Sequence, residues 1–354
     1  MPGHSPSTEE PTTPRRATVS HSSAPDDGPG TTAEDWWVFR GPADLPAPPP
    51  WRSLPESPQA STPQPYLLGR EHVAVVNAAL HLRRPLLVTG RPGTGKSSLA
   101  HAIAEDLGLG DVLRWPVNSR STLADALYRY DAVGRLREAS LDRETRAIRT
   151  TSRKVRHRPR GRRSDIGDFL RLGPLGTALA AEEKPRVLLI DELDKADVDL
   201  PNDLLVVLEE GRFEIPELSR LPEDQQSVDV LVTGSRRRVA VDRGTVACAH
   251  FPIVVMTSNG ERDFPPAFLR RCVRLDLPDP DEDKLRDIVR LHLGAEALTD
   301  AEDLIQNFLQ RASVETLATD QLLAAVHLRV TGADLSQDQL TNTVMHRLDE
   351  AFPA

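Results

Sequence analysis

The amino-acid sequence predicts an α/β protein with a five-stranded parallel sheet in a doubly wound arrangement, followed by a small α-helical lid domain. Two observations predict this fold class. Short apolar runs alternate with segments of helical period, which is the pattern of strands connected by helices. After the segment 278–284, which is rich in proline and aspartate, the pattern is helical to residue 354.

Five apolar runs are predicted to form the strands of the sheet. The first run, 85–90, ends in glycine and precedes the helix-period segment 96–108. The other runs lie at 112–117, 186–191, 251–258 and 272–277. The third and fourth runs are apolar at almost every position, as expected of parallel strands that are buried on both faces.

The N-terminal residues 1–64 are predicted to form a disordered tail. They hold about half of the chain's 30 prolines among small polar and acidic residues, so they cannot bury enough apolar surface to offset the entropy lost on ordering. Two motifs, 36–41 and 46–55, nevertheless carry three of the four tryptophans. Two interpretations stay open: the motifs dock on the chain's own globular part, or they bind a partner's groove as a stiff polyproline segment.

The globular part is predicted to consist of an α/β domain over 65–280 and a helical lid over 281–354. Two insertions interrupt the α/β domain. Residues 135–163 are strongly basic and poor in apolar residues, and we interpret them as a solvated loop in preference to a nucleic-acid contact. Residues 226–250 alternate with a period of two around a Thr-Gly-Ser turn, which predicts a β-hairpin.

The composition excludes several classes of protein. The chain has 44 basic and 53 acidic residues and a net charge of −9, which argues against a general binder of nucleic acid or anionic membranes. Its cysteines, Cys248 and Cys272, are too few for a disulfide framework and lack the spacing of metal ligands. No apolar run approaches the roughly 20 residues of a membrane span, and no signal-like segment begins the chain. We therefore expect a soluble, cytoplasmic protein.

A glycine-rich motif, GRPGTGKS at 90–97, joins the first predicted strand to the following helix. It fits the pattern G-x-x-x-x-G-K-[ST], in which glycines let backbone amides wrap a phosphate and the helix N-terminus adds positive potential. Lys96 is predicted to reach the β and γ phosphates of ATP, and Ser97 to offer its hydroxyl to Mg²⁺. The residues predicted to contact ATP are Gly90, Arg91, Pro92, Gly93, Thr94, Gly95, Lys96, Ser97 and Ser98.

An acidic pair follows the third apolar run. Its position places Asp191 and Glu192 at the carboxyl edge of the sheet, where open α/β folds bind their ligands. We predict that Asp191 holds Mg²⁺ with Ser97, and that Glu192 orients and deprotonates the attacking water. Asp194 has two interpretations, a support of the site or a helix cap, and we favour the cap.

The fourth apolar run ends in the polar cluster 256–261. If this strand lies beside the strand that carries the acidic pair, Asn259 is placed to reach the γ-phosphate or the attacking water. The alternative is an asparagine tolerated in a turn before Gly260. The sequence leaves both interpretations open.

Together these motifs resemble an AAA+ ATPase, which belongs to the ASCE class of P-loop NTPases. The resemblance rests on GRPGTGKS, LLIDELDKA, VVMTSNGE and PPAFLRRC, in that order, followed by a helical lid. Within that superfamily, segments 168–180 and 200–218 are similar to the bacterial MoxR branch. The resemblance extends over about 65–300.

This resemblance implies an assembly and partners. It implies a sheet order of 5-1-4-3-2, with strands counted along the chain, and a homo-oligomeric ring, usually hexameric, that holds nucleotide between neighbouring subunits. The MoxR-like relatives are associated with von Willebrand A-type or protease-like partner proteins. ATP and Mg²⁺ are the substrate and cofactor that the resemblance implies.

Two adjacent arginines, Arg270 and Arg271, follow the short apolar stretch 267–269. The resemblance implies that an arginine after the fourth strand projects into the nucleotide site of the next subunit, as a catalytic arginine finger. Arg271, which directly precedes the fifth run, matches this position better than Arg270. The alternative is an exposed pair at the C-terminus of a helix.

The lid departs from many relatives, which carry an arginine at the start of its third helix. The corresponding segment, 317–330, has Thr319 and Asp320 there, and Arg329 lies too far along the helix to replace it. In the same region, 299–302 and 336–339 match the capping-box pattern of a helix start.

Three functions are consistent with the sequence. We favour an ATP-driven, chaperone-like ring that remodels or activates a partner protein, because the hydrolytic motifs are complete. The basic residues 149–163 support an alternative, a nucleic-acid-linked NTPase of the restriction type that uses ATP or GTP. A nucleotide-switched scaffold with little turnover is the third, and Glu192 argues against it.

Overall fold

The computed structural model describes most of the chain between residues 66 and 345. The described residues are 39, 46–52, 66–151, 165–312, 317–333, 335–336, 339–340 and 343–345, with only the backbone for 142–151. By its contacts the chain divides into two units, 1–46 and 47–354. The predicted tail therefore lies largely outside the described residues, including its motif at 36–41.

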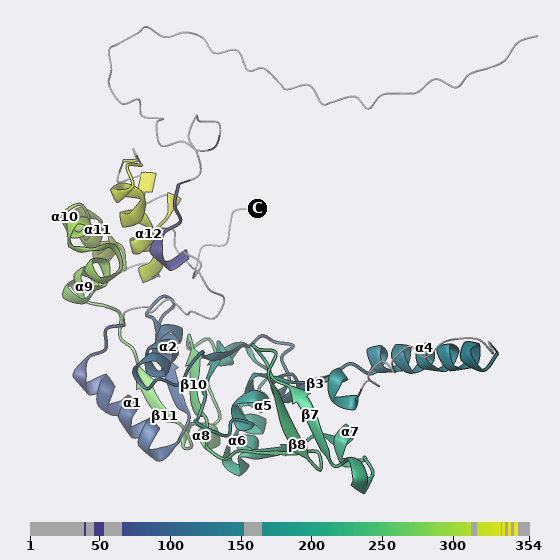
Figure 1. Ribbon diagram of the computed structural model, residues 1–354. Helices are drawn as coiled ribbons and strands as arrows, with labels where there is room; N and C mark the ends of the chain where they lie inside the picture. Colours follow the sequence, from purple (N-terminus) through teal and green to yellow (C-terminus); the bar gives the residue numbers. More distant parts are fainter. Residues whose placement is uncertain are drawn as a thin grey trace, which may run out of the picture. The chain divides into compact units, whose positions relative to one another are not determined.

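The prediction of a five-stranded parallel sheet is confirmed (Figure 1). Its strands lie in the order β11-β1-β10-β5-β2, and all four neighbouring pairs are parallel. Counted along the chain, this is the order 5-1-4-3-2. The strands are β1 (Leu86–Thr89), β2 (Leu113–Pro116), β5 (Val187–Asp191), β10 (Ile253–Ser258) and β11 (Val273–Asp276). Each lies within the apolar run that predicted it.

Both faces of this sheet are buried, as the continuous apolar runs require. Because side chains alternate along a strand, Leu86 and Val88 of β1 pack on one face and Leu87 on the other. The first face is covered by α1 (Arg70–Leu82) and α2 (Lys96–Asp106). The second face is covered by α5 (Pro174–Leu179), α6 (Leu200–Glu210) and α8 (Pro266–Leu269).

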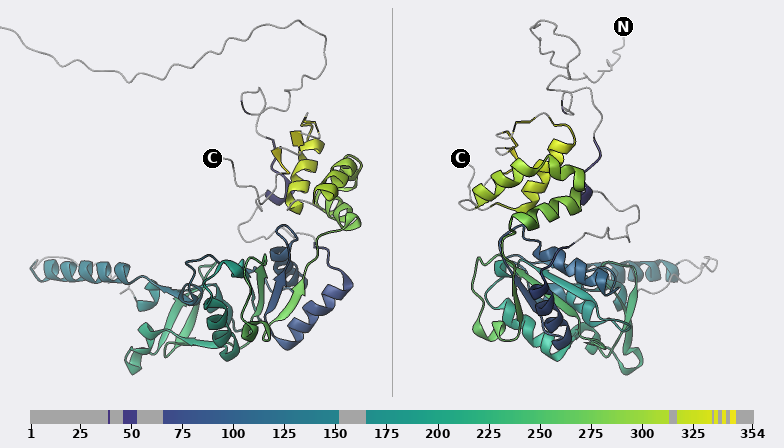
Figure 2. Two further views of the ribbon diagram at one scale, coloured as in Figure 1. Left: turned by 180° about the vertical axis from the view of Figure 1, so that it is seen from behind. Right: turned by 90° about the vertical axis from the view of Figure 1, so that its left-hand side faces the viewer.

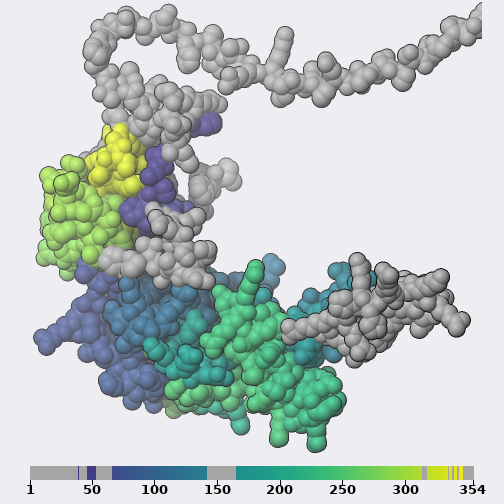
Figure 3. All heavy atoms as spheres, in the orientation of Figure 1, coloured from purple at the N-terminus to yellow at the C-terminus, as the bar shows by residue number. Residues whose placement is uncertain are grey.

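A second sheet has six strands. Its buried side chains belong to the same apolar cluster as those on the second face of the first sheet. Its order is β3-β4-β7-β8-β9-β6. Figure 3 shows the green part of the chain packed directly against its blue and teal parts. The strands are β3 (Tyr128–Tyr130), β4 (Leu170–Leu172), β6 (Arg212–Glu214), β7 (Ser227–Leu231), β8 (Arg238–Asp242) and β9 (Thr245–Ala247). Strands β7 and β8 are an antiparallel pair within the segment 226–250. The sequence analysis did not predict the other four strands of this sheet.

The first part of the basic insertion is helical, so the prediction of a loop there is wrong. Helix α4 (Ala132–Thr151) extends away from the second sheet, as Figure 2 shows, and 152–164 lie outside the described residues. Asp131 begins the helix, since its Oδ1 accepts the Gly134 N–H at 2.7 Å. The segment is rich in Arg, Glu, Ala and Leu, which favour helix without the help of a buried face.

The C-terminal region forms a separate apolar cluster of helices. These are α9 (Glu282–Leu293), α10 (Ala295–Thr299), α11 (Glu302–Ala312) and α12 (Thr319–Val330). Trp51, from the second tail motif, packs against this cluster, and its ring meets His327 edge-on with centroids 5.6 Å apart. Trp51 thus docks on its own chain.

Of the two predicted capping boxes, one is present. Ser336 and Gln339 exchange the reciprocal hydrogen bonds, at 2.8 and 3.2 Å. The other is wrong, because Thr299 ends α10 and the Glu302 carboxylate is bound by Arg286 instead. No helix within the described residues is both long and apolar enough to cross a membrane.

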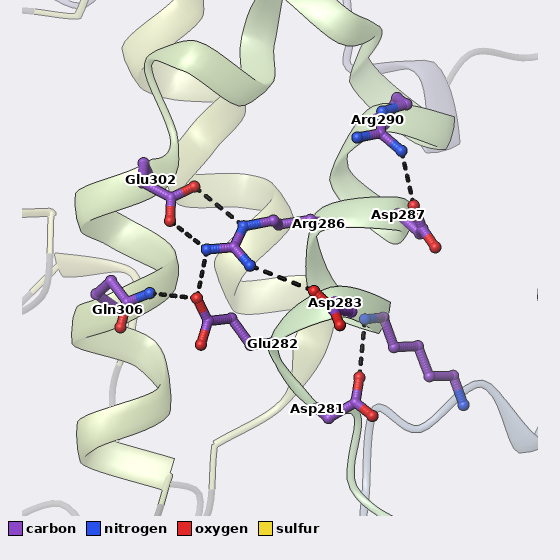
Figure 4. Close-up of polar contacts among 9 residues, drawn as sticks. Asp281, Glu282, Asp283, Arg286, Asp287, Arg290, Glu302 and Gln306 are labelled. Atoms are coloured by element: carbon purple, nitrogen blue, oxygen red, sulfur yellow. Dashed lines mark hydrogen bonds and ion pairs between the residues drawn. The ribbon is translucent and has the colours of Figure 1, made fainter.

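Arg286 links α9 to α11 through a network of carboxylates (Figure 4). Its guanidinium bonds to Glu302, with Nε to Oε2 at 3.2 Å, and also to Glu282 on its own helix. Gln306 donates to Glu282 at 2.6 Å and completes the bridge. The hydrogen bond from Arg286 holds the pKa of Glu302 below its ordinary value.

Replacing Glu302 with Gln is expected to lower the urea midpoint of the helical region at pH 7. A depressed pKa means that the stabilisation is present above the unfolded value of 4.5 and is lost as the pH falls through the folded value. The difference between wild type and Glu302→Gln should therefore shrink as the pH falls below 4.5. The control is Asp287→Asn, which breaks an exposed pair with Arg290 inside α9 and should change little. An equal effect of both variants would contradict the bridging role.

Candidate nucleotide site

The glycine-rich loop lies between β1 and α2, and its backbone excludes larger residues. Gly93 and Gly95 have φ values of 79° and 84°, in the left-handed region. A Cβ atom on Gly93 would lie 2.6 Å from the Cβ of Ala318, in the segment before α12. The loop conformation therefore depends on glycine at this position.

Lys96, the first residue of α2, is buried beneath this loop. Its Nζ donates to the carbonyl oxygens of Gly90 and Arg91, both at 2.7 Å. Burial lowers the pKa of Lys96, and the nearby carboxylates of Asp194, Asp191 and Glu192 oppose this shift. An ammonium has three N–H donors, and two of those of Lys96 are used by the carbonyl groups. The third donor and the buried positive charge suit an anion.

Ser97 and Asp191 are brought together although they are 94 residues apart in sequence. Asp191 is the last residue of β5, is buried, and accepts the Ser97 hydroxyl at 2.7 Å. The same oxygen accepts from Thr257 Oγ1 at 2.8 Å, and the second oxygen pairs with Arg114 Nη2 at 2.7 Å. Burial alone raises the pKa of Asp191, but hydrogen bonds from Ser97, Arg114 and Thr257 outweigh it and lower the pKa. This carboxylate is therefore held ionised.

Glu192 has an unusual backbone conformation for a residue with a side chain. Its φ of 61° and ψ of 49° are left-handed, a state that costs about 1–3 kcal/mol and recurs at functional sites. Its N–H donates to Thr257 Oγ1 at 2.9 Å, which fixes this turn to β10. Its half-exposed carboxylate pairs with Lys195 Nζ at 3.0 Å. Asp191 and Glu192 thus point into different surroundings, one buried and one accessible to solvent.

Asn259 follows β10, which lies beside β5 in the sheet. Its N–H donates to the buried Asp194 Oδ2 at 2.8 Å, and the Glu261 N–H donates to the same oxygen at 3.1 Å. The interpretation of Asp194 as a helix cap is therefore wrong: its carboxylate holds the loop that carries Asn259. A cap would bond its own helix, whereas Asp194 lies inside a short turn and faces a neighbouring strand.

The other residues of the motif surround a small cavity. Its volume is about 230 Å³, and Gly93, Thr94, Gly95 and Ser98 line one side. Residues of the lid complete the lining, including Lys284, Thr319 and Asp320. Arg91 points elsewhere and pairs with Asp279 at 3.2 Å. Pro92 is partly buried and is not among the lining residues.

Arg329 takes no part in this cavity. Its guanidinium is engaged within the lid, where it pairs with Asp303 and donates to the Asp300 carbonyl at 3.0 Å. This position agrees with the departure noted in the sequence.

The two candidate finger arginines are not part of this cluster within the chain. Arg270 is exposed and caps the C-terminus of α8. Arg271 pairs with Glu209 of α6, and its Nη1 lies 3.5 Å from the Ala267 carbonyl oxygen. No contact between either arginine and the glycine-rich loop is present among the described residues. Within the described residues both arginines therefore lie apart from the phosphate loop.

The residues at this site fit a triphosphate with Mg²⁺. The loop amides and buried Lys96 suit phosphate oxygens, and the hydroxyl of Ser97 with the ionised Asp191 forms the oxygen donor set that Mg²⁺ prefers. A cation at Asp191 would compete with the Arg114 guanidinium for the carboxylate.

Sequence reasoning missed two residues of this site, Thr257 and Arg114, and favoured the wrong one of two interpretations of Asp194. Thr257 binds both acidic residues, Arg114 neutralises Asp191, and Asp194 holds the 259–261 loop. The sheet order could have revealed Thr257, because β10 beside β5 places it opposite the end of that strand. Nothing in the run 112–117 marks Arg114.

Comparison with known proteins places the chain in a family. None of the curated proteins matches it. Two single-residue variants of RuvB from Thermotoga maritima are similar in structure, with TM-scores of 0.37 and 0.39 and identities of 14% and 17%. The alignments cover 77% and 78% of this chain and 66% and 69% of those chains. Scores this low carry no argument about function. Residues 85–272 match the model of the AAA domain (dynein-related subfamily), and because this match covers more than half of the 354 residues, the chain belongs to that family.

Proposed function

We propose that this protein is a MoxR-like AAA+ ATPase that hydrolyses ATP with Mg²⁺ in a ring, usually hexameric in this superfamily, and uses the energy to remodel or activate a partner protein. The family match supports the superfamily, and AAA+ proteins commonly form rings. The observation that carries the proposal is the hydrogen bond from Ser97 to Asp191 beside the buried Lys96. It joins the phosphate loop to the acidic strand in one site.

Two regions of the chain have distinct roles in this proposal. The region 65–280 binds nucleotide, and the region 281–354 is the lid that covers it. The von Willebrand A-type or protease-like proteins suggested by the MoxR resemblance are the candidate partners.

The loop residues and Lys96 bind the phosphates. Loop amides donate to phosphate oxygens, and Lys96 turns its third donor to the β and γ phosphates. Ser97 and Asp191 hold the metal ion, which when bound neutralises charge on the phosphates. Arg114 and Thr257 keep Asp191 oriented and ionised.

Glu192 acts as the base for the attacking water. Its left-handed turn and half-exposed carboxylate support this role, because the group is placed by the backbone yet accessible to water. Asn259 orients the same water or the γ-phosphate, and Asp194 positions Asn259. Arg271 completes the site of a neighbouring subunit, and Arg270 supports it there.

Replacing Lys96 with Ala tests the binding step. Loss of a charge-assisted contact is expected to weaken ATP binding by about tenfold or more and to abolish phosphate release. The measurement is titration of a fluorescent ATP analogue, with phosphate release measured in parallel. The control is Lys195→Ala, which removes a nearby exposed lysine outside the loop. Unchanged ATP affinity in Lys96→Ala would contradict the assignment of the loop.

A further inference from the structure

A second cavity, larger than the one at the glycine-rich loop, lies where the two sheets meet. Its volume is about 720 Å³, within the range of roughly 300–1,000 Å³ typical of ligand sites. It lies beside the edge strand β2 and the loop that follows it, and the rest of its lining comes from β3, β4 and the turn that connects β7 to β8. The two cavities share no lining residue.

The lining of this cavity is strongly basic. It includes Arg114, Arg120, Arg129 and Arg171, but one carboxylate, that of Asp125. Arg114 is engaged with Asp191, and Asp125 already accepts from Thr122. The remaining three arginines, which we call the arginine triad (Arg120, Arg129 and Arg171), form no ion pair with any residue that the structure describes.

Two members of the triad are paired in a way that costs stability. Arg129 of β3 and Arg171 of β4 are directly opposite each other in the antiparallel register. Like charges at such positions repel. The Asp125 carboxylate interacts electrostatically with Arg129, but neither arginine forms an ion pair within the described residues. Repulsion that the chain compensates only in part is typical of a site that binds an external group. The missing partner is an anion.

The surroundings favour carboxylates over nucleic acid. Single strands of nucleic acid bind to exposed aromatic rings, but the aromatic side chain in this lining, Trp115, is only 6% exposed. The polar lining instead offers hydroxyl and amide groups, among them Ser119, Ser121 and Thr233. Arginine pairs with carboxylates and phosphates alike in a planar, two-bond geometry, so the preference for a peptide rests on the buried Trp115 and the hydroxyl and amide lining.

We propose that the arginine triad binds an acidic peptide segment of the partner protein. The inference deepens the proposed function, because it names the chemistry of the segment that the ring engages. It rests on the proposed function only in assigning the acidic segment to the protein that the ring remodels. Binding to the triad needs no nucleotide, so its failure and the failure of the ATPase assignment can be told apart.

The test is fluorescence anisotropy of a labelled glutamate–glycine repeat peptide with the full chain, without nucleotide. Arg171→Ala and Arg120→Ala are each expected to weaken binding by about tenfold or more, because each removes a charge-assisted contact. Binding should weaken as salt rises. A glutamine–glycine repeat of the same length should not bind. The matched control is Arg274→Ala, on the opposite edge strand β11, which should bind like the wild type.

A measurement of thermal stability distinguishes loss of peptide binding from loss of the folded state. Because Arg129 and Arg171 repel each other, Arg171→Ala should unfold at an equal or higher temperature than the wild type while its peptide affinity falls. The proposal is overturned if the wild type does not bind the acidic peptide at low salt, or if Arg171→Ala binds it unchanged. It is equally overturned if single-stranded DNA binds through the triad and the acidic peptide does not.

Discussion

Replacing Arg271 with Ala is expected to lower ATP turnover by about 10³–10⁵-fold, the effect of an arginine finger that balances charge on the transferring phosphoryl group. Arg271 pairs with Glu209 of α6. Within the described residues it does not contact the glycine-rich loop of its own chain. We propose that its charge serves a neighbouring subunit. ATP binding to Arg271→Ala should remain, because Lys96 and the loop are unchanged.

The Glu209 pair provides the control for this variant. Glu209→Gln removes the same exposed ion pair but leaves the guanidinium of Arg271 in place. Such a pair contributes about 0–1 kcal/mol, so neither variant should unfold the protein. Glu209→Gln is expected to retain turnover. If both variants lose turnover equally, the ion pair and not the finger is what matters.

Replacing Glu192 with Gln is expected to lower turnover by about 10²–10⁴-fold while ATP binding persists, since a general base contributes about that much. Glutamine has nearly the same shape and keeps the left-handed turn that Thr257 fixes. Only the proton acceptor is lost. Phosphate release and ATP titration on the same preparation measure both effects.

Lys195→Met is the companion variant for Glu192. It removes the ammonium that pairs with the Glu192 carboxylate at 3.0 Å and leaves the base itself intact. Turnover should change far less than in Glu192→Gln. Full turnover by Glu192→Gln would remove this residue from the mechanism.

The strands of the first sheet could be predicted because each is a continuous apolar run that needs burial on both faces. The order of strands came from the resemblance to AAA+ proteins, and it is the order observed. The meeting of Ser97 and Asp191 followed from that order, since both lie at the carboxyl edge. These features depend on patterns that are strong within short segments.

The remaining features depend on long-range pairing that leaves little local signal. Strands β3, β4, β6 and β9 have three residues each, too short for a period to show. Helix α4 is highly charged and has few apolar residues. Its charge favoured the interpretation as a loop, although its residues have good helix propensity. Asp194 was misread because its partners, the amides of Asn259 and Glu261, lie on another strand's loop.

We propose that two subunits build each hydrolytic site, one providing Glu192 and the other Arg271. Mixing Glu192→Gln with Arg271→Ala tests this most directly. Each variant alone is expected to hydrolyse little ATP, whereas a mixed ring would contain subunit interfaces in which both groups are intact. We predict that phosphate release rises above that of either variant alone and is greatest near equal proportions. Release that stays at the level of the separate variants at every mixing ratio, with mixed assemblies present, would contradict the claim.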